Sequence, residues 1–207
     1  GCVCAGGEDR PMSLALFDFD HTLTSIDTYG CFLRTIATPR QLSEAKWKIG
    51  PWIVGYRMDL VSAAGLRARA TRLAFNGRSQ YDIVRQGERF ATGILPGTLR
   101  PDMMHRLQQH RSNGDEVVIV SGSLDAYLQP WCAQHGLALI CNRLEADGDL
   151  LTGRYEGGDC GADKVTRIRA RYNLETYARI YAYGDSREDL PMLALAHERW
   201  YRGNRLA

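Results

Sequence analysis

A short apolar run that ends in two carboxylates constrains this chain more than any other stretch. Residues 14–17 read Leu-Ala-Leu-Phe, and Asp18, Asp20 and Thr22 follow at alternate positions. Such a run is typical of a buried parallel strand, and open α/β sheets place their chemistry at the carboxyl ends of these strands. Because the chain must leave the strand at once, Asp18 and Asp20 can face one pocket. Two carboxylates that close attract a divalent cation.

Two later strands are expected to end in small polar groups in the same way. Residues 117–120 are fully apolar and precede Ser121-Gly122, whereas residues 179–183 precede Gly184-Asp185 and, farther on, Asp189. A glycine-rich loop then places Lys164 at the start of a helix that reaches about residue 171. The helix dipole disfavours a lysine in the first turn, so an acidic partner nearby is expected.

The stretch between the first and second of these strands contains helical patterns and no strand signal. Helices are expected over 28–35, from 39 to an interruption at Pro51 and Gly55, over 59–75 and over 81–90. We interpret residues 27–92 as a small helical cap inserted into an α/β core of residues 13–26 and 93–207, preceded by a leader of residues 1–12. The remaining pattern predicts helices at 101–110 and 125–135, a strand at 137–141, a hairpin over 144–155 and a last strand near Trp200. The fold class is therefore α/β, with a doubly wound, mostly parallel sheet.

Composition excludes several classes of function. The net charge is +2 over 207 residues, which implies no strong attraction to nucleic acid or membrane, and we interpret Arg67, Arg69 and Arg72 as a solvated helix face. No apolar run approaches the roughly 20 residues of a membrane span, and a signal-peptide core is missing, so a cytoplasmic location is expected. The six cysteines show no disulfide framework. The oligomeric state is not readable from the sequence.

Taken together, four stretches resemble the motifs of the haloacid dehalogenase superfamily, in particular its phosphoserine-phosphatase-like branch (subfamily IB). They are Asp18-Phe19-Asp20-His21-Thr22, Ser121 after an apolar strand, Lys164 at a helix start, and Gly184-Asp185-Ser186-x-x-Asp189. The resemblance covers nearly the whole chain from Ser13 onwards. It implies a Rossmann-like core with an inserted cap and a Mg²⁺-dependent phosphomonoester hydrolase that forms an aspartyl phosphate.

The resemblance also implies a role for each motif residue. Asp18 would be the nucleophile, and Asp20 would protonate the leaving alkoxide and later take a proton from water. Mg²⁺ would be held by the Asp18 carboxylate, the Asp20 backbone carbonyl and Asp185. The phosphoryl group would be bound by Thr22, Ser121, Gly122 and Lys164, with Asp189 supporting Lys164 or a metal-bound water.

The substrate is less constrained than the chemistry. In phosphoserine phosphatases a glutamate after the first motif meets the substrate amine and a cap arginine meets its carboxylate. Asp27 and Arg69 are the corresponding candidates here, and their alternatives are a helix cap and a solvated arginine. Phosphoserine, histidinol phosphate, a phospholipid head group and other small monoesters all stay open as substrates.

Two other classes of function also stay open. A non-catalytic or regulatory domain would not need a proton donor two residues after a nucleophile, and glycosyl transfer on the Asp-x-Asp motif leaves Lys164, Asp185 and Asp189 unexplained. For the phosphatase, we expect the cap to open and close on hinges at residues 25–27 and 93–96.

Overall fold

The core of the protein is a mostly parallel sheet. The computed structural model describes residues 12–206, so the predicted leader lies outside the described residues except for Met12. The sheet order is β3-β2-β1-β6-β7-β8, and every neighbouring pair is parallel except β7 with β8. The strands are β1 (Leu14–Phe17), β2 (Glu116–Leu124), β3 (Ala138–Asn142), β6 (Ile180–Gly184), β7 (Glu198–Tyr201) and β8 (Asn204–Leu206). The predicted α/β fold class is confirmed.

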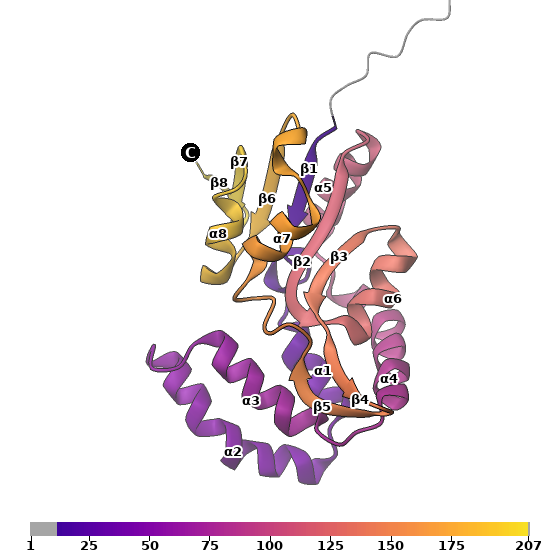
Figure 1. Ribbon diagram of the computed structural model, residues 1–207, viewed down its shortest axis with the longest axis vertical. Coiled ribbons are helices and arrows are strands. Elements are labelled where there is room, and N and C mark those ends of the chain that lie inside the picture. Colours follow the sequence, from indigo (N-terminus) through magenta and orange to yellow (C-terminus); the bar gives the residue numbers. More distant parts are fainter. Residues whose placement is uncertain (1–11, 207) are drawn as a thin grey trace, which may run out of the picture.

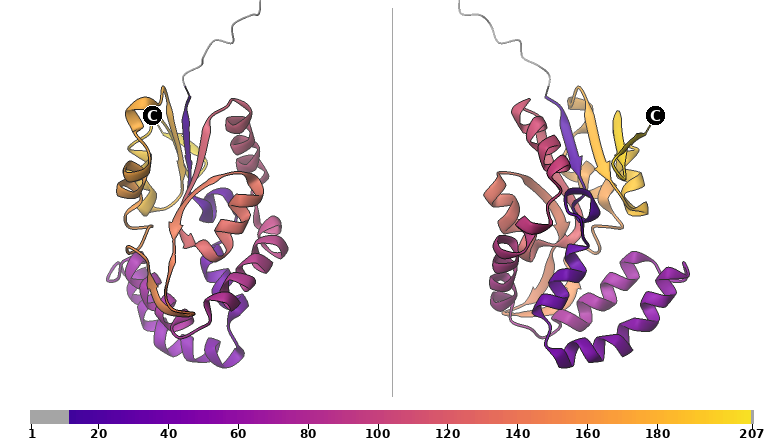
Figure 2. Two further views of the ribbon diagram at one scale, coloured as in Figure 1. Left: turned by 45° about the vertical axis from the view of Figure 1, so that its right-hand side comes forward. Right: turned by 180° about the vertical axis from the view of Figure 1, so that it is seen from behind.

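Helices cover both faces of this sheet. Figure 2 shows α5 (Pro101–Ser112) and α6 (Asp125–His135) on one face, and α7 (Lys164–Arg171) and α8 (Leu190–Leu193) on the other. This is the doubly wound arrangement expected when strands and helices alternate. Short helical turns within residues 12–206 are η1 (Phe19–Leu23), η2 (Leu95–Thr98), η3 (Leu174–Thr176) and η4 (Arg187–Asp189). No helix in this range is long and apolar enough to cross a membrane.

Four helices are inserted between β1 and α5, the helix that leads into β2: α1 (Thr28–Ile36), α2 (Pro39–Arg57), α3 (Ala63–Phe75) and α4 (Gln80–Gly93). Figure 1 shows α1, α2 and α3 beyond the end of the sheet, and α4 beside α6. The predicted break at Pro51 and Gly55 is wrong, because α2 continues to Arg57. Pro51 costs the helix one hydrogen bond on a solvent-exposed surface, and a capping box of Thr38 and Gln41 stabilises its start. Helix α3 begins at Ala63, capped by Ser62, rather than at residue 59.

The predicted hairpin is present as β4 (Leu144–Asp147) and β5 (Leu150–Tyr155). It joins the inserted helices: the Leu151 N–H donates to the Arg78 carbonyl at 2.9 Å, and the Gly77 N–H donates to the Leu151 carbonyl at 2.8 Å. Residues far apart in the sequence thus form the end of the molecule beyond the sheet. The cap boundaries at residues 27 and 92 stay a prediction.

The two connections between the sheet and the inserted helices lie side by side. The Ser25 N–H donates to the Thr98 carbonyl at 2.8 Å, and the Arg100 N–H donates to the Leu23 carbonyl at 2.8 Å. Both predicted hinges are therefore next to this paired crossing, and a hinge motion there stays a prediction.

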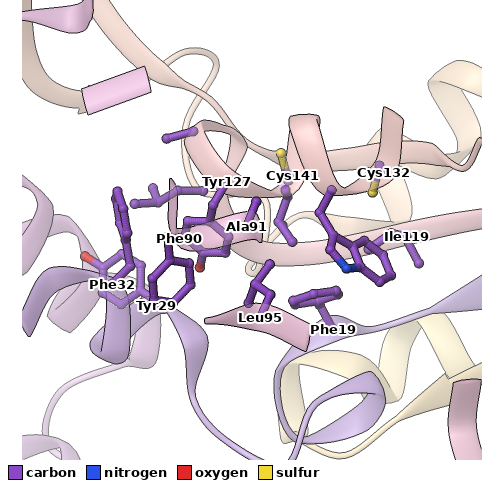
Figure 3. Close-up of a cluster of buried hydrophobic side chains, with 14 of the residues drawn as sticks. Phe19, Tyr29, Phe32, Phe90, Ala91, Leu95, Ile119, Tyr127, Cys132 and Cys141 are labelled. Carbon is purple, nitrogen blue, oxygen red and sulfur yellow. The ribbon is translucent and has the colours of Figure 1, made fainter. Parts of the chain in front are cut away.

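One buried cluster connects the sheet with the inserted helices. Figure 3 shows Ile119 and Phe19 at one end of this cluster, Tyr127 in its middle, and Phe90 and Phe32 towards the other end. The ring centroids of Phe32, Phe90 and Tyr127 lie 5.0–5.2 Å apart, within the favourable range for aromatic pairs. Helices α1 and α4 are thereby packed against α6 and the sheet.

The contact between α4 and α6 depends on a glycine. A Cβ atom on Gly87 would lie 2.0 Å from the Ala126 carbonyl oxygen, so Gly87→Ala should force the helices apart and reduce the free energy of unfolding by about 1–3 kcal/mol. Gly93→Ala is the matched control in the same helix, because a Cβ there meets nothing within 4 Å. Urea unfolding of both variants measures the effect, and equal stabilities would contradict this account of the contact.

Candidate active site

The ends of three adjacent strands bring the sequence motifs together. Phe17 at the end of β1 pairs with Ile119 of β2 on one side and with Tyr183 of β6 on the other. All three strands are parallel, so Asp18, Ser121 and Asp185 emerge at one edge of the sheet, as the sequence predicts. The Asp18 N–H continues the ladder by donating to the Tyr183 carbonyl at 2.9 Å.

A buried lysine links two of the acidic residues. Lys164 Nζ lies 2.6 Å from Asp18 Oδ1 and 2.5 Å from Asp189 Oδ1, and the three side chains are at most 9% exposed. The acidic partner expected for a lysine at a helix start is therefore present twice. Lys164 reaches these groups from the first position of α7, across the edge of the sheet.

The three charges shift one another's proton affinity. Burial opposes the charged form of Lys164, but Asp18 and Asp189 raise its pKa above the ordinary value. Burial would raise the pKa of Asp189 as well, yet Lys164 and backbone N–H groups hold that pKa below its usual range. For Asp18, burial and the charge of Asp189 outweigh Lys164, so its pKa is raised. Lys164 thus favours the charged form of Asp189, whereas burial and Asp189 disfavour the charged form of Asp18.

Asp189 is fixed by backbone donors. Its Oδ2 accepts from the Asp185 N–H at 3.0 Å, the Ser186 N–H at 2.8 Å and the Ser186 hydroxyl at 2.8 Å. A Cβ atom on Gly184 would lie 2.5 Å from Asp189 Cβ, so only glycine allows this close approach. Residues 184–189 thus form a loop, held by these hydrogen bonds, that presents Asp185 and Asp189 to the site.

The donor set fits a hard divalent cation. One carboxylate oxygen each from Asp18, Asp185 and Asp189 lie within 4.8 Å of one another. The ammonium group of Lys164 contacts two of these three carboxylates, those of Asp18 and Asp189. Carboxylate oxygens are the ligands that Mg²⁺ prefers. Asp189 accepts one hydrogen bond at Oδ1 and three at Oδ2, whereas Asp18 Oδ2 has only a 3.5 Å contact with the Thr22 hydroxyl, so Asp18 and Asp185 are the carboxylates best able to hold the ion.

Asp20 is held by hydroxyl groups that the sequence analysis did not identify. Its Oδ1 accepts from the Thr28 N–H at 2.7 Å and from the Thr28 hydroxyl, and its Oδ2 accepts from the Ser123 hydroxyl. The Thr28 hydroxyl also contacts the Tyr127 hydroxyl at 3.1 Å. Burial raises the pKa of Asp20, and the bonds from Ser123 and Thr28 limit that rise. A carboxyl group with a raised pKa suits a role as proton donor.

Of the other residues expected to bind phosphate, Thr22 lies beside Asp18, and Ser121 and Gly122 lie in the last part of β2. The Thr22 hydroxyl lies 3.5 Å from Asp18 Oδ2, and Ser121 is fully buried with its hydroxyl accepting from the Ser123 N–H at 3.0 Å. Asn142, which the sequence analysis missed, joins two motifs: it donates to the Gly122 carbonyl at 2.7 Å and accepts from the Cys160 N–H at 2.6 Å. The feature that could have identified Asn142 is its position at the end of β3, the strand beside β2.

The two candidate substrate residues, Asp27 and Arg69, have other partners in the structure. Asp27 is exposed and caps α1, accepting from the Gly30 N–H at 3.0 Å, which was the alternative for this residue. Arg69 is exposed, with its guanidinium 4.9 Å from the Trp52 ring centroid and 3.4 Å from the Lys48 carbonyl. The interpretation of Arg67 as solvated is wrong, because it binds Asp159 and Glu188 and its side chain is 16% exposed. A helix repeat alone does not show which of several arginines faces another loop.

Known proteins are similar in sequence to this chain. A model of the haloacid dehalogenase-like hydrolases matches residues 15–194. Protein CicA of Caulobacter vibrioides is 34% identical over 193 residues, which cover 91% of this chain and 85% of that protein. Phosphoserine phosphatase SerB1 of Mycobacterium tuberculosis is 29% identical, with 93% of this chain and 67% of that protein covered.

A solved structure supports the fold separately. A protein of unknown function from Bordetella pertussis superposes with a TM-score of 0.76 at 23% identity, covering 91% of this chain and 88% of that one. At this level of identity the likeness concerns the fold alone.

Proposed function

Because this chain belongs to the haloacid dehalogenase-like hydrolases and is a phosphatase of that family, we propose that it hydrolyses small phosphomonoesters with Mg²⁺ through an aspartyl phosphate on Asp18. The observation that carries the proposal is the buried ammonium of Lys164 between Asp18 and Asp189. A phosphate monoester is an anion that repels a carboxylate nucleophile, so a fixed positive charge at the point of attack removes the main obstacle.

In the first half-reaction, an oxygen of Asp18 attacks phosphorus and the bond from phosphorus to the ester oxygen breaks. Asp20 gives its proton to the departing alkoxide, which leaves as the alcohol. Lys164 stabilises the charge on the phosphoryl oxygens, together with the hydroxyls of Thr22 and Ser121.

In the second half-reaction, Asp20 takes a proton from a water molecule, whose oxygen attacks phosphorus. The bond between phosphorus and the Asp18 oxygen breaks, so inorganic phosphate leaves and the Asp18 carboxylate returns. Asp20 is then protonated again for the next cycle. Mg²⁺, when held by Asp18, Asp185 and the Asp20 carbonyl, would supply positive charge to the phosphoryl oxygens.

The structure supports the proposed reaction more strongly than it supports any particular substrate. SerB1 is named a phosphoserine phosphatase, which keeps phosphoserine among the candidates. However, Asp27 acts as a helix cap and Arg69 lies against Trp52, so neither residue argues for an amino-acid substrate. We propose the broader class of small phosphomonoesters.

The direct test is phosphate release from a panel of small phosphomonoesters, including phosphoserine, histidinol phosphate, glycerol phosphate and an aryl phosphate. We expect release in Mg²⁺ and none after removal of the ion with EDTA. An Asp185→Asn variant should need more Mg²⁺ for half-maximal activity, because it loses one charged ligand. No release from any ester by folded, Mg²⁺-loaded protein would favour the non-catalytic alternative.

The bond from Ser123 to Asp20 leads to a prediction about pH dependence. This bond lowers the pKa of Asp20, so Ser123→Ala should raise that pKa further. Asp20 must be protonated to release a poor leaving group, so activity is lost as the pH rises through its pKa. The alkaline limb of the kcat/KM profile should therefore move to higher pH in Ser123→Ala.

The leaving group provides the control for this prediction. An alkyl phosphate such as glycerol phosphate needs the proton, whereas an aryl phosphate with an acidic phenol does not. The shift should appear with the first substrate and be absent with the second. An alkaline limb that moves to lower pH, or moves equally for both substrates, would contradict the role given to Asp20.

A further inference from the structure

One cap arginine binds two loops of the core at once. Arg67 lies in α3 and donates from Nε and Nη2 to the two oxygens of Asp159, both at 2.9 Å. Its Nη1 and Nη2 also donate to the two oxygens of Glu188, both at 2.8 Å. Both pairs are bidentate, the strongest geometry available to a guanidinium. The side chains are 16%, 11% and 25% exposed for Arg67, Asp159 and Glu188, so solvent screens these pairs only in part.

The two carboxylates belong to the loops that carry the catalytic groups. Asp159 stands in the loop that leads to Lys164, where it also accepts from the Gly161 N–H at 2.7 Å. Glu188 stands between Asp185 and Asp189 in η4. Arg67 therefore touches both the loop before the buried lysine and the loop of the metal-binding carboxylates.

Two glycines make room for this guanidinium. A Cβ atom on Gly161 would lie 2.4 Å from Arg67 Nη2, and one on Gly122 would lie 3.4 Å from Arg67 Cζ. Gly122 directly follows Ser121 of the phosphate-binding strand end. The backbone thus leaves a space that Arg67 fills, beside the residues expected to bind phosphate. On the cap side, the Tyr29 hydroxyl donates to the Arg67 carbonyl at 3.2 Å and fixes this turn of α3.

A second ion pair between the cap and the core is weaker than those of Arg67. Asp59, at the turn between α2 and α3, lies 3.3 Å from Arg187, but these side chains are 81% and 83% exposed. Exposed pairs contribute little because water and salt screen them. The closed arrangement of these loops therefore depends mainly on Arg67.

We propose that Arg67 is a positioning residue that couples closure of the cap to assembly of the active site. This inference rests on the proposed phosphatase function. Because the guanidinium of Arg67 donates four hydrogen bonds to Asp159 and Glu188, it acts on the two loops and not on the substrate. When the cap opens, the two loops lose their common partner; when it closes, Lys164, Asp185 and Asp189 return to their working positions.

The activity test compares Arg67→Gln with Arg72→Gln, an exposed arginine in the same helix. We expect Arg67→Gln to reduce kcat/KM by about 10- to 100-fold, as small misplacements of catalytic groups do, and Arg72→Gln to change it less than about twofold. Phosphoserine carries a carboxylate and glycerol phosphate does not. The reduction should be the same factor for both, whereas a loss confined to phosphoserine would show that Arg67 reads the substrate and would overturn the proposal.

A second readout needs no turnover, which separates this inference from the proposed function. Amide hydrogen exchange should become faster in residues 157–163 and 185–189 of Arg67→Gln, and stay unchanged in Arg72→Gln. Exchange in β1 and β2 serves as the check that the core remains folded. If Arg67→Gln exchanges like the control in both loops, the coupling is wrong, whether or not the wild-type protein releases phosphate.

Neutralising one of the two carboxylates tests the same contacts by changing the partner of Arg67. Arg67→Gln leaves Asp159 and Glu188 close together without their shared cation, so part of its defect should come from their repulsion. Adding Asp159→Asn to Arg67→Gln should then recover part of the lost kcat/KM, although the same change in the wild-type background should reduce it. Purely additive losses would contradict an interaction through Arg67.

Discussion

Asp18→Asn is expected to reduce Mg²⁺-dependent phosphate release by about 10³- to 10⁵-fold, the range typical for loss of a covalent nucleophile. The amide is isosteric with the carboxylate but does not attack phosphorus. Steady-state phosphate release from the best substrate of the panel measures the effect. Asp147→Asn, an exposed change at the end of β4, is the control and should leave activity unchanged.

The same variant should remain folded, which makes the result interpretable. Burial and the charge of Asp189 raise the pKa of Asp18, so the folded protein disfavours the charged form of this carboxyl group. The asparagine removes that cost, while Lys164 keeps its bond to Asp189. We expect Asp18→Asn to melt at the same temperature as the wild type or higher. Substantial turnover by this folded variant would overturn the aspartyl-phosphate mechanism.

Lys164→Met should have the second large effect, on stability as well as activity. Removing the ammonium leaves Asp18 and Asp189 buried without their partner, a change that costs about 3–5 kcal/mol in comparable buried pairs. Urea unfolding at pH 7 without Mg²⁺ measures this loss. Arg169→Met, at an exposed position of the same helix, should be close to neutral. Activity of Lys164→Met should be lost with every ester, because the role proposed for Lys164 is to stabilise the phosphoryl group, which all of them share.

The pH dependence of that loss follows from the two carboxylates. Asp189 has a lowered pKa in the folded protein, so it contributes stability above its unfolded pKa of about 3.9, and this is lost as the pH falls through the folded value. That contribution requires Lys164. Loss of the lysine also raises the pKa of Asp18 further, which penalises the variant most when that group is ionised. The stability difference should therefore be largest at neutral pH and shrink as the pH falls below about 4. A difference that grows on acidification would contradict the ion pair.

The fold was largely predictable because its signals are local. The fully apolar run before Ser121 and the run before Asp18 each predict a buried strand, and both are central strands of the sheet. The errors include the inserted helices, where α2 continues through Pro51, and the end of the sheet, where β8 follows the predicted last strand. Proline and glycine in a sequence predict the end of a helix, but an exposed helix surface tolerates the one hydrogen bond that a proline removes.

The sequence by itself determined which groups meet at the edge of the sheet. Parallel strands share one carboxyl edge, so the order of the motifs along the chain was enough to bring Asp18, Ser121 and Asp185 together. Lys164 at a helix start required acidic partners, and the structure provides Asp18 and Asp189.

Only the tertiary structure decided which residues support those groups. Ser123 and Thr28 hold Asp20 from different elements, and Arg67, rather than Arg69, reaches the core from α3. Residues on one helix differ in direction by 100° per position, so Arg67 and Arg69 point about 200° apart, and the rotation of α3 about its axis decides which of them meets Asp159 and Glu188. That rotation is set by packing against the β4–β5 hairpin, a long-range contact that no local pattern encodes.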